Sequence, residues 1–226
     1  MRRSFLSKLH YSVFTLLFVS LAAKAEYQVI GKAYDRASGQ YLYSEYHSCS
    51  AGELECSVDY RDSSGQLIAS KELNYSTGLT QPALLMKDYR TGTNTSVGSQ
   101  YREGLVVDAG FDNFVRHQWD VLAAGDTVKF PFLVAGFEEP LNMRAYLNRS
   151  RSCGDEELCL EISLDSWLLG FLVEPIHLVY SRNNRTLLSY QGLSNIRGEN
   201  SESLIVDIQY LYTEQTPWTG SEAYSF

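Results

Sequence analysis

Charged side chains occur on predicted strand faces that are otherwise apolar. In the segment 67–75, Lys71 lies at every-second-residue spacing from Leu67, Ala69, Leu73 and Tyr75, and Glu45 and His47 share a face with Tyr41 and Tyr43 in the same way. If these faces point into the protein, Lys71 and Glu45 would be costly to bury unless each met an opposite charge. An inward Lys71–Glu45 pair would mark the base of a pocket, whereas an outward orientation would make both residues surface charges. The sequence leaves both interpretations open.

Three further residues are candidates for contact with a ligand. Arg90 and Asn195 follow segments of strand-like sequence, at ends where a pocket mouth could lie, although turn formation is the simpler role for both. Trp119 lies on a predicted helix, where filling the core is its simplest role. The candidate ligand-binding residues are therefore Glu45, His47, Lys71, Arg90, Trp119 and Asn195.

No catalytic motif is recognisable in the chain. It has no Gly-x-Ser-x-Gly elbow, no phosphate-binding glycine loop and no His-Glu-x-x-His pair, and His47, His117 and His177 stand apart from one another. We therefore name no catalytic residue and expect neither a metal nor a cofactor. Catalytic residues scattered over several strands would leave no local signature, so an enzyme built around Glu45, His47, Lys71 and Arg90 stays open as an alternative.

The four cysteines form two closely spaced pairs, Cys49-x6-Cys56 and Cys153-x5-Cys159. Polar, turn-like residues separate the members of each pair, and strand-like sequence flanks them, so the simplest pairing closes two local hairpins. Disulfides are typical of exported proteins. Structural zinc sites favour closely paired C-x2-C spacings, which these are not, and we expect two disulfides.

The elements that must position these residues are mostly strands. Apolar and polar residues alternate in the segments 141–147, 158–164 and 204–212, which is typical of half-buried antiparallel strands. Turn signals separate such runs at short intervals, at 37–39, 63–65, 182–184 and 197–200. The fold class predicted is mainly β, with a single curved antiparallel meander sheet or open barrel of about ten strands. Segments 77–81 and 91–100 are predicted loops over an open edge or a cavity mouth.

One segment interrupts the strand pattern. Apolar residues recur at roughly helical spacing over 112–124, Asp112 could cap the start and Gly125 could end it. We predict one short amphipathic helix there. A second helical turn is weakly indicated over 166–172.

The N-terminus has the three parts of a secretory signal peptide. Arg2, Arg3 and Lys8 precede an uncharged, largely apolar run over 11–23, and small residues lead to a cleavage site after Ala25. The apolar run is shorter than the ~20 residues that span a bilayer as a helix. We therefore expect export to a bacterial periplasm as a cleaved chain.

The cleaved chain would be a single acidic β-rich domain over 26–226. Removal of 1–25 takes away four basic residues and no acidic one, so the formal net charge of −8 becomes −12. A surface of that sign repels phosphate groups, which argues against nucleic acid and against electrostatic docking to membranes. The chain ends in Phe226 with Tyr224 before it, a pattern like the assembly signal of outer-membrane β-barrels. Pro217, Gly220 and Glu222 argue against it, but a small barrel stays an alternative.

Several short stretches resemble uncharacterised families of exported bacterial β-rich proteins. The residues that carry the resemblance are Gly31, Ala33, Ser38, Gly39, Leu42, Tyr43 and Glu45, then Tyr60, Gly65, Ile68, Ala69 and Lys71, and finally Tyr190, Gly192, Ser194 and Asn195. Some of these families are distantly similar in outline to the periplasmic lipoprotein carriers. That resemblance implies a curved antiparallel sheet wrapped around a helical plug, and it implies no transferable activity.

The leading hypothesis from the sequence is a non-catalytic periplasmic protein for envelope maintenance. Its curved sheet and helix would enclose an apolar cavity for a lipid-like or other hydrophobic ligand, since a concave apolar face supplies such a site without special residues. The sequence names neither partner proteins nor the ligand.

Overall fold

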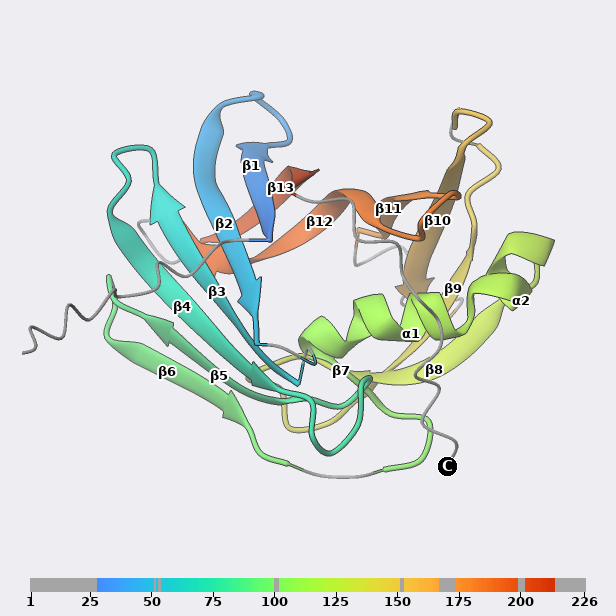
Figure 1. The fold of residues 1–226 in the computed structure, drawn as a ribbon, viewed down its shortest axis with the longest axis horizontal. Helices are drawn as coiled ribbons and strands as arrows, with labels where there is room; N and C mark the ends of the chain where they lie inside the picture. Colours follow the sequence, from blue (N-terminus) through green and yellow to red (C-terminus); the bar gives the residue numbers. More distant parts are fainter. Residues whose placement is uncertain are drawn as a thin grey trace, which may run out of the picture.

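The computed structural model describes residues 28–50, 52, 54–99, 102–150, 153–166, 174–198 and 202–213. The predicted signal peptide, most of the segment 166–172 and the C-terminal residues from 214 lie outside these ranges. Within them the chain is mainly β, as the sequence predicts (Figure 1). None of the described helices is long and apolar enough to cross a membrane.

The strands form one open sheet of 13 members among the described residues. Its order is β6-β5-β4-β3-β2-β1-β13-β12-β11-β10-β9-β8-β7, and every pair is antiparallel except β7 and β8. The strands are β1 (Val29–Asp35), β2 (Tyr41–Cys49), β3 (Glu55–Asp62), β4 (Leu67–Asn74), β5 (Ala83–Asp88), β6 (Thr93–Val97), β7 (Val106–Val107), β8 (Val128–Leu133), β9 (Leu141–Leu147), β10 (Glu157–Leu164), β11 (Ile176–Ser181), β12 (Leu187–Arg197) and β13 (Ser203–Tyr212).

Alternation of apolar and polar residues places the strands as the sequence predicts. The alternating segments 141–147, 158–164 and 204–212 coincide with β9, β10 and β13. The segment 91–100 differs from the prediction, since it contains the edge strand β6 and not only a loop. Its residues Thr-Asn-Thr-Ser-Val are mostly exposed, so β6 has no apolar face to reveal it.

The predicted helix forms in two pieces behind a 3-10 turn. The turn η1 (Asp108–Gly110) leads into α1 (Phe111–His117), and α2 (Trp119–Ala124) follows after a break at Gln118. Gly125 ends α2 in a left-handed conformation with φ of +95°, which glycine adopts without strain. Asp112 is not the N-cap, because the turn η1 extends the helical segment backwards to Asp108.

The helices lie on the concave side of the sheet, against β8 to β10 (Figure 1). Phe114, Val115 and Leu122 of the helices pack with Leu158 and Leu160 of β10 in the largest buried apolar cluster. A second cluster lies between β1 to β4 and β12 to β13. Tyr190 packs against both clusters.

The two edges of the open sheet are brought together by side chains and by the β4–β5 loop. Leu73, Leu84 and Val97 of β4 to β6 pack with Val107 of β7 and Leu133 of β8. Within the loop, the Thr80 carbonyl accepts a hydrogen bond of 2.8 Å from the Val107 N–H, and the Gln81 amide exchanges two hydrogen bonds with the Arg102 backbone. The predicted loop 77–81 therefore lies at the seam between the sheet edges.

Both predicted disulfides are present. Cys49 and Cys56 are directly opposite each other in the β2–β3 ladder, and Cys153 joins the loop before β10 to Cys159 within it. The first bond joins the two arms of the β2–β3 hairpin, as predicted, whereas the second ties the β9–β10 connection to β10.

Candidate functional site

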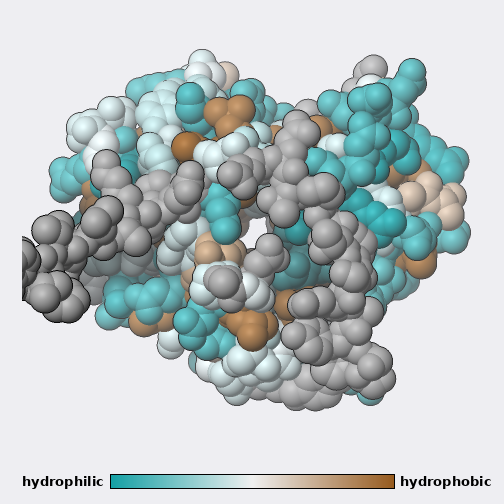
Figure 2. Space-filling model, in the orientation of Figure 1, coloured by the Kyte–Doolittle hydropathy of each residue, from teal (hydrophilic) through white to brown (hydrophobic). Residues whose placement is uncertain are grey.

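A cavity of about 860 Å³ opens on the concave side of the sheet. Its wall takes side chains from both halves of the sheet and from α1, so it lies where the curved sheet faces the helix. Val58, Leu73, Phe111, Phe130 and Leu178 give it a large apolar surface. Figure 2 shows the molecular surface hollowed near the middle of this face. Small-molecule sites in proteins are usually about 300 to 1,000 Å³ and mainly apolar, and this cavity fits that description.

Lys71 of β4 points into the protein and forms a buried ion pair. Its Nζ lies 2.7 Å from Asp108 Oδ1, and the two side chains are only 3% and 6% exposed. Asp108 Oδ2 also accepts a hydrogen bond of 3.5 Å from the Ala135 N–H. The partner of Lys71 is therefore Asp108 and not Glu45, although both glutamate and lysine face inward.

Asp108 reaches Lys71 from an unusual backbone conformation. Asp108 has a φ of +38°, in the left-handed region that non-glycine residues rarely adopt. Such conformations cost about 1–3 kcal/mol and persist where the surrounding structure enforces them. Here the turn from β7 into η1 holds the carboxylate 2.7 Å from the Lys71 ammonium.

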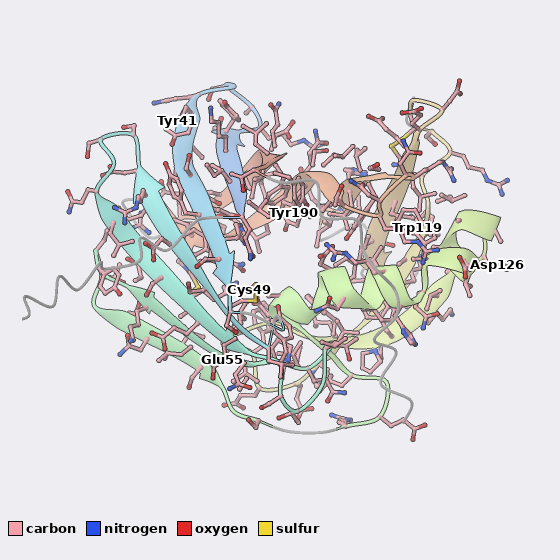
Figure 3. The ribbon with its side chains drawn as sticks, in the orientation of Figure 1. Tyr41, Cys49, Glu55, Trp119, Asp126 and Tyr190 are labelled. Carbon is pink, nitrogen blue, oxygen red and sulfur yellow. A yellow bond between two sulfur atoms is a disulfide. The ribbon has the colours of Figure 1, made fainter. Side chains whose placement is uncertain are left out.

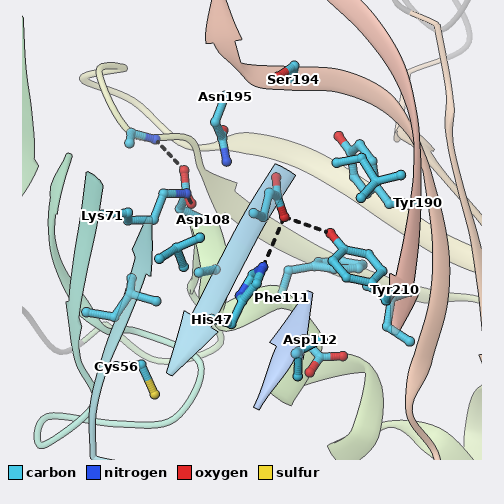
Figure 4. A pocket seen from close by; sticks show the side chains of 18 of the residues that line it. His47, Cys56, Lys71, Asp108, Phe111, Asp112, Tyr190, Ser194, Asn195 and Tyr210 are labelled. Carbon is cyan, nitrogen blue, oxygen red and sulfur yellow. Dashed lines mark hydrogen bonds and ion pairs between the residues drawn. The ribbon is translucent and has the colours of Figure 1, made fainter. Parts of the chain in front are cut away.

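Glu45 of β2 is the second buried charge that lines the cavity. Its Oε2 accepts hydrogen bonds from His47 Nε2 at 3.0 Å and from the Tyr210 hydroxyl at 3.3 Å (Figure 4). The side chain of Glu45 is 8% exposed, against 32% for His47. His47 thus lies between the buried carboxylate and the more open part of the cavity.

Gly31 makes the contact between Glu45 and Tyr210 possible. In the β2-β1-β13 ladder Gly31 lies opposite both residues, so their side chains meet above it. A Cβ at Gly31 would lie 2.9 Å from Tyr210 Cε1 and 3.2 Å from Glu45 Oε2. Only a glycine leaves this space on the central strand.

Four tyrosines surround Glu45 and line the same cavity: Tyr43, Tyr60, Tyr190 and Tyr210. Burial raises the pKa of each phenol, and the nearby Glu45 carboxylate raises it further. Their hydroxyls are engaged, since Tyr43 is 2.6 Å from Ser194 Oγ and Tyr190 donates to the Leu193 carbonyl at 2.7 Å.

The cavity wall on α1 carries a third polar group. Asp112 forms an ion pair of 2.6 Å with Arg116 one turn along the helix, and it accepts a hydrogen bond of 3.0 Å from the Tyr180 hydroxyl. Burial, followed by the Asp112 carboxylate, raises the pKa of Tyr180. The helix is thereby fixed to β11 across the cavity wall.

The structure brings four of the six candidate residues to the cavity. Glu45, His47, Lys71 and Asn195 line it, and Asn195 hydrogen-bonds to Tyr60. Arg90 lies instead at the turn after β5, where it pairs with Asp88 at 2.7 Å. Trp119 packs in the core (Figure 3). The centre of its ring lies 5.9 Å from that of the Tyr180 ring and 5.3 Å from the Arg185 guanidinium.

Sequence reasoning missed Asp108, Asp112 as a cavity residue, and the tyrosines around Glu45. The pairing of Lys71 with Asp108 joins residues 37 positions apart, and only the fold brings them together. Across the described part of the chain, no group of three His, Cys, Asp or Glu side chains is arranged to hold a metal ion.

The buried tyrosines predict a loss of stability at alkaline pH. The folded protein raises the pKa of Tyr43, Tyr60, Tyr180 and Tyr210 well above the ordinary value of 10.0. Above about pH 10 the unfolded chain loses phenolic protons that the folded chain keeps, so each such tyrosine lowers the unfolding free energy by about 1.4 kcal/mol per pH unit. Below that pH the stability is retained.

Urea unfolding measured at rising pH, together with tyrosinate absorbance, checks this expectation. We expect a steep fall in stability above about pH 10, with the buried tyrosines ionising only as the protein unfolds. A gradual ionisation of all tyrosines in a protein that keeps its near-ultraviolet circular dichroism would contradict it.

A comparison of the whole chain with protein-family models and with curated proteins finds no match. The geometry of the site therefore carries the functional argument.

Proposed function

We propose that this protein is a non-catalytic binding protein of the bacterial envelope that holds a hydrophobic or lipid-like small molecule in the concavity of its sheet. The observation that carries the proposal is the cavity of about 860 Å³ with its aliphatic and aromatic wall. Burial of an apolar ligand against such a wall is favourable by roughly 25 cal/mol for each Å² removed from water.

The polar groups of the cavity support binding of a molecule with a polar end. Lys71 interacts with Asp108, and Glu45 with His47 and Tyr210. A few placed polar groups in an apolar wall orient a ligand and select among ligands. A molecule with one polar end and an apolar body matches this distribution.

The envelope assignment rests on the predicted signal peptide and on the chemistry of the cysteines. The two disulfides fit an exported protein, because such bonds persist in oxidising compartments. Release into the periplasm after cleavage at Ala25 is part of the proposal, and N-terminal sequencing of the exported chain tests it.

Native mass spectrometry of protein purified without detergent from its host's envelope tests the binding. We expect a co-purifying small molecule that organic extraction recovers. The variant Met86→Trp should lose it, because Met86 lines the cavity opposite Lys71 and a larger ring there fills the space. Leu85→Trp is the matched control, since Leu85 is opposite the exposed Glu72 on the other side of the sheet.

Two outcomes would contradict the proposal. One is a protein that carries no small molecule, and the other is a molecule that Met86→Trp retains as well as Leu85→Trp does.

An envelope enzyme is the second candidate, and one observation favours it. Glu45, His47 and Lys71 line a single cavity, and a carboxylate bonded to an imidazole at 3.0 Å is a pair that could transfer protons. Arg90 is not part of that arrangement. Returning the extracted ligand to the emptied protein separates the candidates: recovery of the unchanged ligand supports a binding protein, whereas a product that Glu45→Gln fails to form supports an enzyme.

A further inference from the structure

The charges that line the cavity are unevenly compensated. Among the described lining residues, Lys71 is paired with Asp108 at 2.7 Å and Arg116 with Asp112 at 2.6 Å. The Glu45 carboxylate accepts hydrogen bonds from the Tyr210 hydroxyl, which is neutral, and from the His47 ring, which carries a charge only when protonated. The remaining basic lining residue, Arg197, is exposed near the end of β12.

Aromatic rings complete the surroundings of this carboxylate. The rings are those of four tyrosines on four different strands: Tyr43 on β2, Tyr60 on β3, Tyr190 on β12 and Tyr210 on β13. Along the strand order, β3 lies on one side of β2 and β1, and β13 and β12 lie on the other. The rings of Tyr43 and Tyr60 are 6.0 Å apart and tilted by 59°. The hydrogen bonds of Tyr43 to Ser194 and of Tyr190 to Leu193 hold two of the rings in place.

A carboxylate among electron-rich rings is the arrangement that stabilises an organic cation. The face of an aromatic ring attracts a cation within about 6 Å of its centre, and the attraction strengthens when water is excluded. A buried carboxylate also attracts the cation directly, and this attraction is strong because little water is present to screen it.

We infer that the ligand of this cavity is an amphipathic organic cation whose ammonium group lies beside Glu45 among the four tyrosines. The inference rests on the proposed function, since it names the chemical class of the same site's ligand. The apolar body of the ligand lies along the wall formed by Phe111, Phe130 and Leu178.

An anionic lipid such as a fatty acid fits the same cavity poorly. Beside Glu45 its carboxylate would face a like charge, and the Lys71 ammonium is already within 2.7 Å of Asp108. To recruit Lys71, the ligand would have to leave Asp108 as an unpaired buried charge, which is costly.

Calorimetric titration of the protein with three probes of equal chain length tests the inference. The probes are dodecyltrimethylammonium, 1-dodecanol and dodecanoate, each below its micelle concentration. We expect dodecyltrimethylammonium to bind roughly tenfold more tightly than the alcohol, and dodecanoate to bind most weakly.

Two variants locate the charge. Glu45→Gln should weaken dodecyltrimethylammonium binding by roughly tenfold while changing 1-dodecanol binding by less than about twofold. Glu72→Gln removes an exposed carboxylate from the outer side of β4, where it pairs with Lys87 at 3.2 Å, and should change neither. The ranking of the probes on the unaltered protein stands even if Glu45→Gln does not fold.

The outcomes separate this inference from the proposed function. Dodecanoate binding as tightly as dodecyltrimethylammonium, or a Glu45→Gln variant that keeps full affinity for the cation, would overturn the inference and leave the hydrophobic site standing. Failure of all three probes to bind would overturn both.

Discussion

Replacing Lys71 with methionine is expected to lower the unfolding free energy by about 3–5 kcal/mol, the cost of leaving one member of a buried ion pair alone. Methionine nearly preserves the length of the side chain, so the loss comes from the charge. Asp108 would remain buried, 6% exposed, without the ammonium 2.7 Å away that compensates it. Urea denaturation of Lys71→Met measures the change.

Two further variants make this result specific to the buried pair. Lys87→Met removes the same group from the exposed pair with Glu72 and should cost at most about 1 kcal/mol. The double variant Lys71→Met/Asp108→Asn removes both charges while keeping a residue that tolerates positive φ, and it should recover most of the loss. A Lys71→Met protein as stable as Lys87→Met would refute the account of this pair.

Replacing Gly110 with alanine is expected to open the seam between the two sheet edges. The added Cβ would lie 2.2 Å from the Thr80 carbonyl oxygen, which is backbone and cannot rotate away as a side chain could. That same oxygen accepts the hydrogen bond from the Val107 N–H, so relief of the clash breaks the link between the β4–β5 loop and β7. We expect the unfolding free energy to fall by about 3 kcal/mol, the upper part of the range for overpacking.

Hydrogen exchange identifies where that loss occurs. In Gly110→Ala the amides of 75–81 and of β7 should exchange faster than in the unaltered protein. Gly78→Ala is the matched control in the same loop, because a Cβ at Gly78 would meet no atom within 4 Å. Equal stability and equal exchange in the two variants would show that the seam does not depend on this contact.

The sheet could be predicted from the sequence because burial of one face imposes a period of two. The segments that became β9 and β10 carry an apolar residue at every second position, and these residues are buried or half-buried. The edge strand β6 could not be predicted in this way. It contributes one buried residue, Val97, and an edge strand without an apolar face leaves no alternation to detect.

The sequence left the orientation of Lys71 and Glu45 open and did not identify their partners. The positions of Lys71 and Glu45 among apolar residues showed that something must compensate them if the faces are buried. The identity of each partner depends on topology, since Asp108 approaches from the far edge of the sheet and Tyr210 lies on the last strand, which β1 separates from the strand of Glu45. Local sequence patterns contain neither fact.

The exclusion of Arg90 and Trp119 from the cavity has the same origin. Arg90 forms a short-range pair with Asp88 in its own turn, and Trp119 faces the core side of its helix. A polar residue near a strand end and an aromatic residue on an amphipathic helix are common features, so composition alone does not distinguish turn and core roles from contact with a ligand.

The claim that the cavity is a binding site is tested most directly by methyl NMR of the protein titrated with 1-dodecanol. This neutral probe is independent of the charge selectivity inferred above. The account predicts shifts for the methyl groups of the lining residues Val58, Ile176 and Leu178, with those of the exposed Leu54 and Leu79 unchanged. Shifts confined to the exposed methyl groups, or no saturable shift at all, would contradict it.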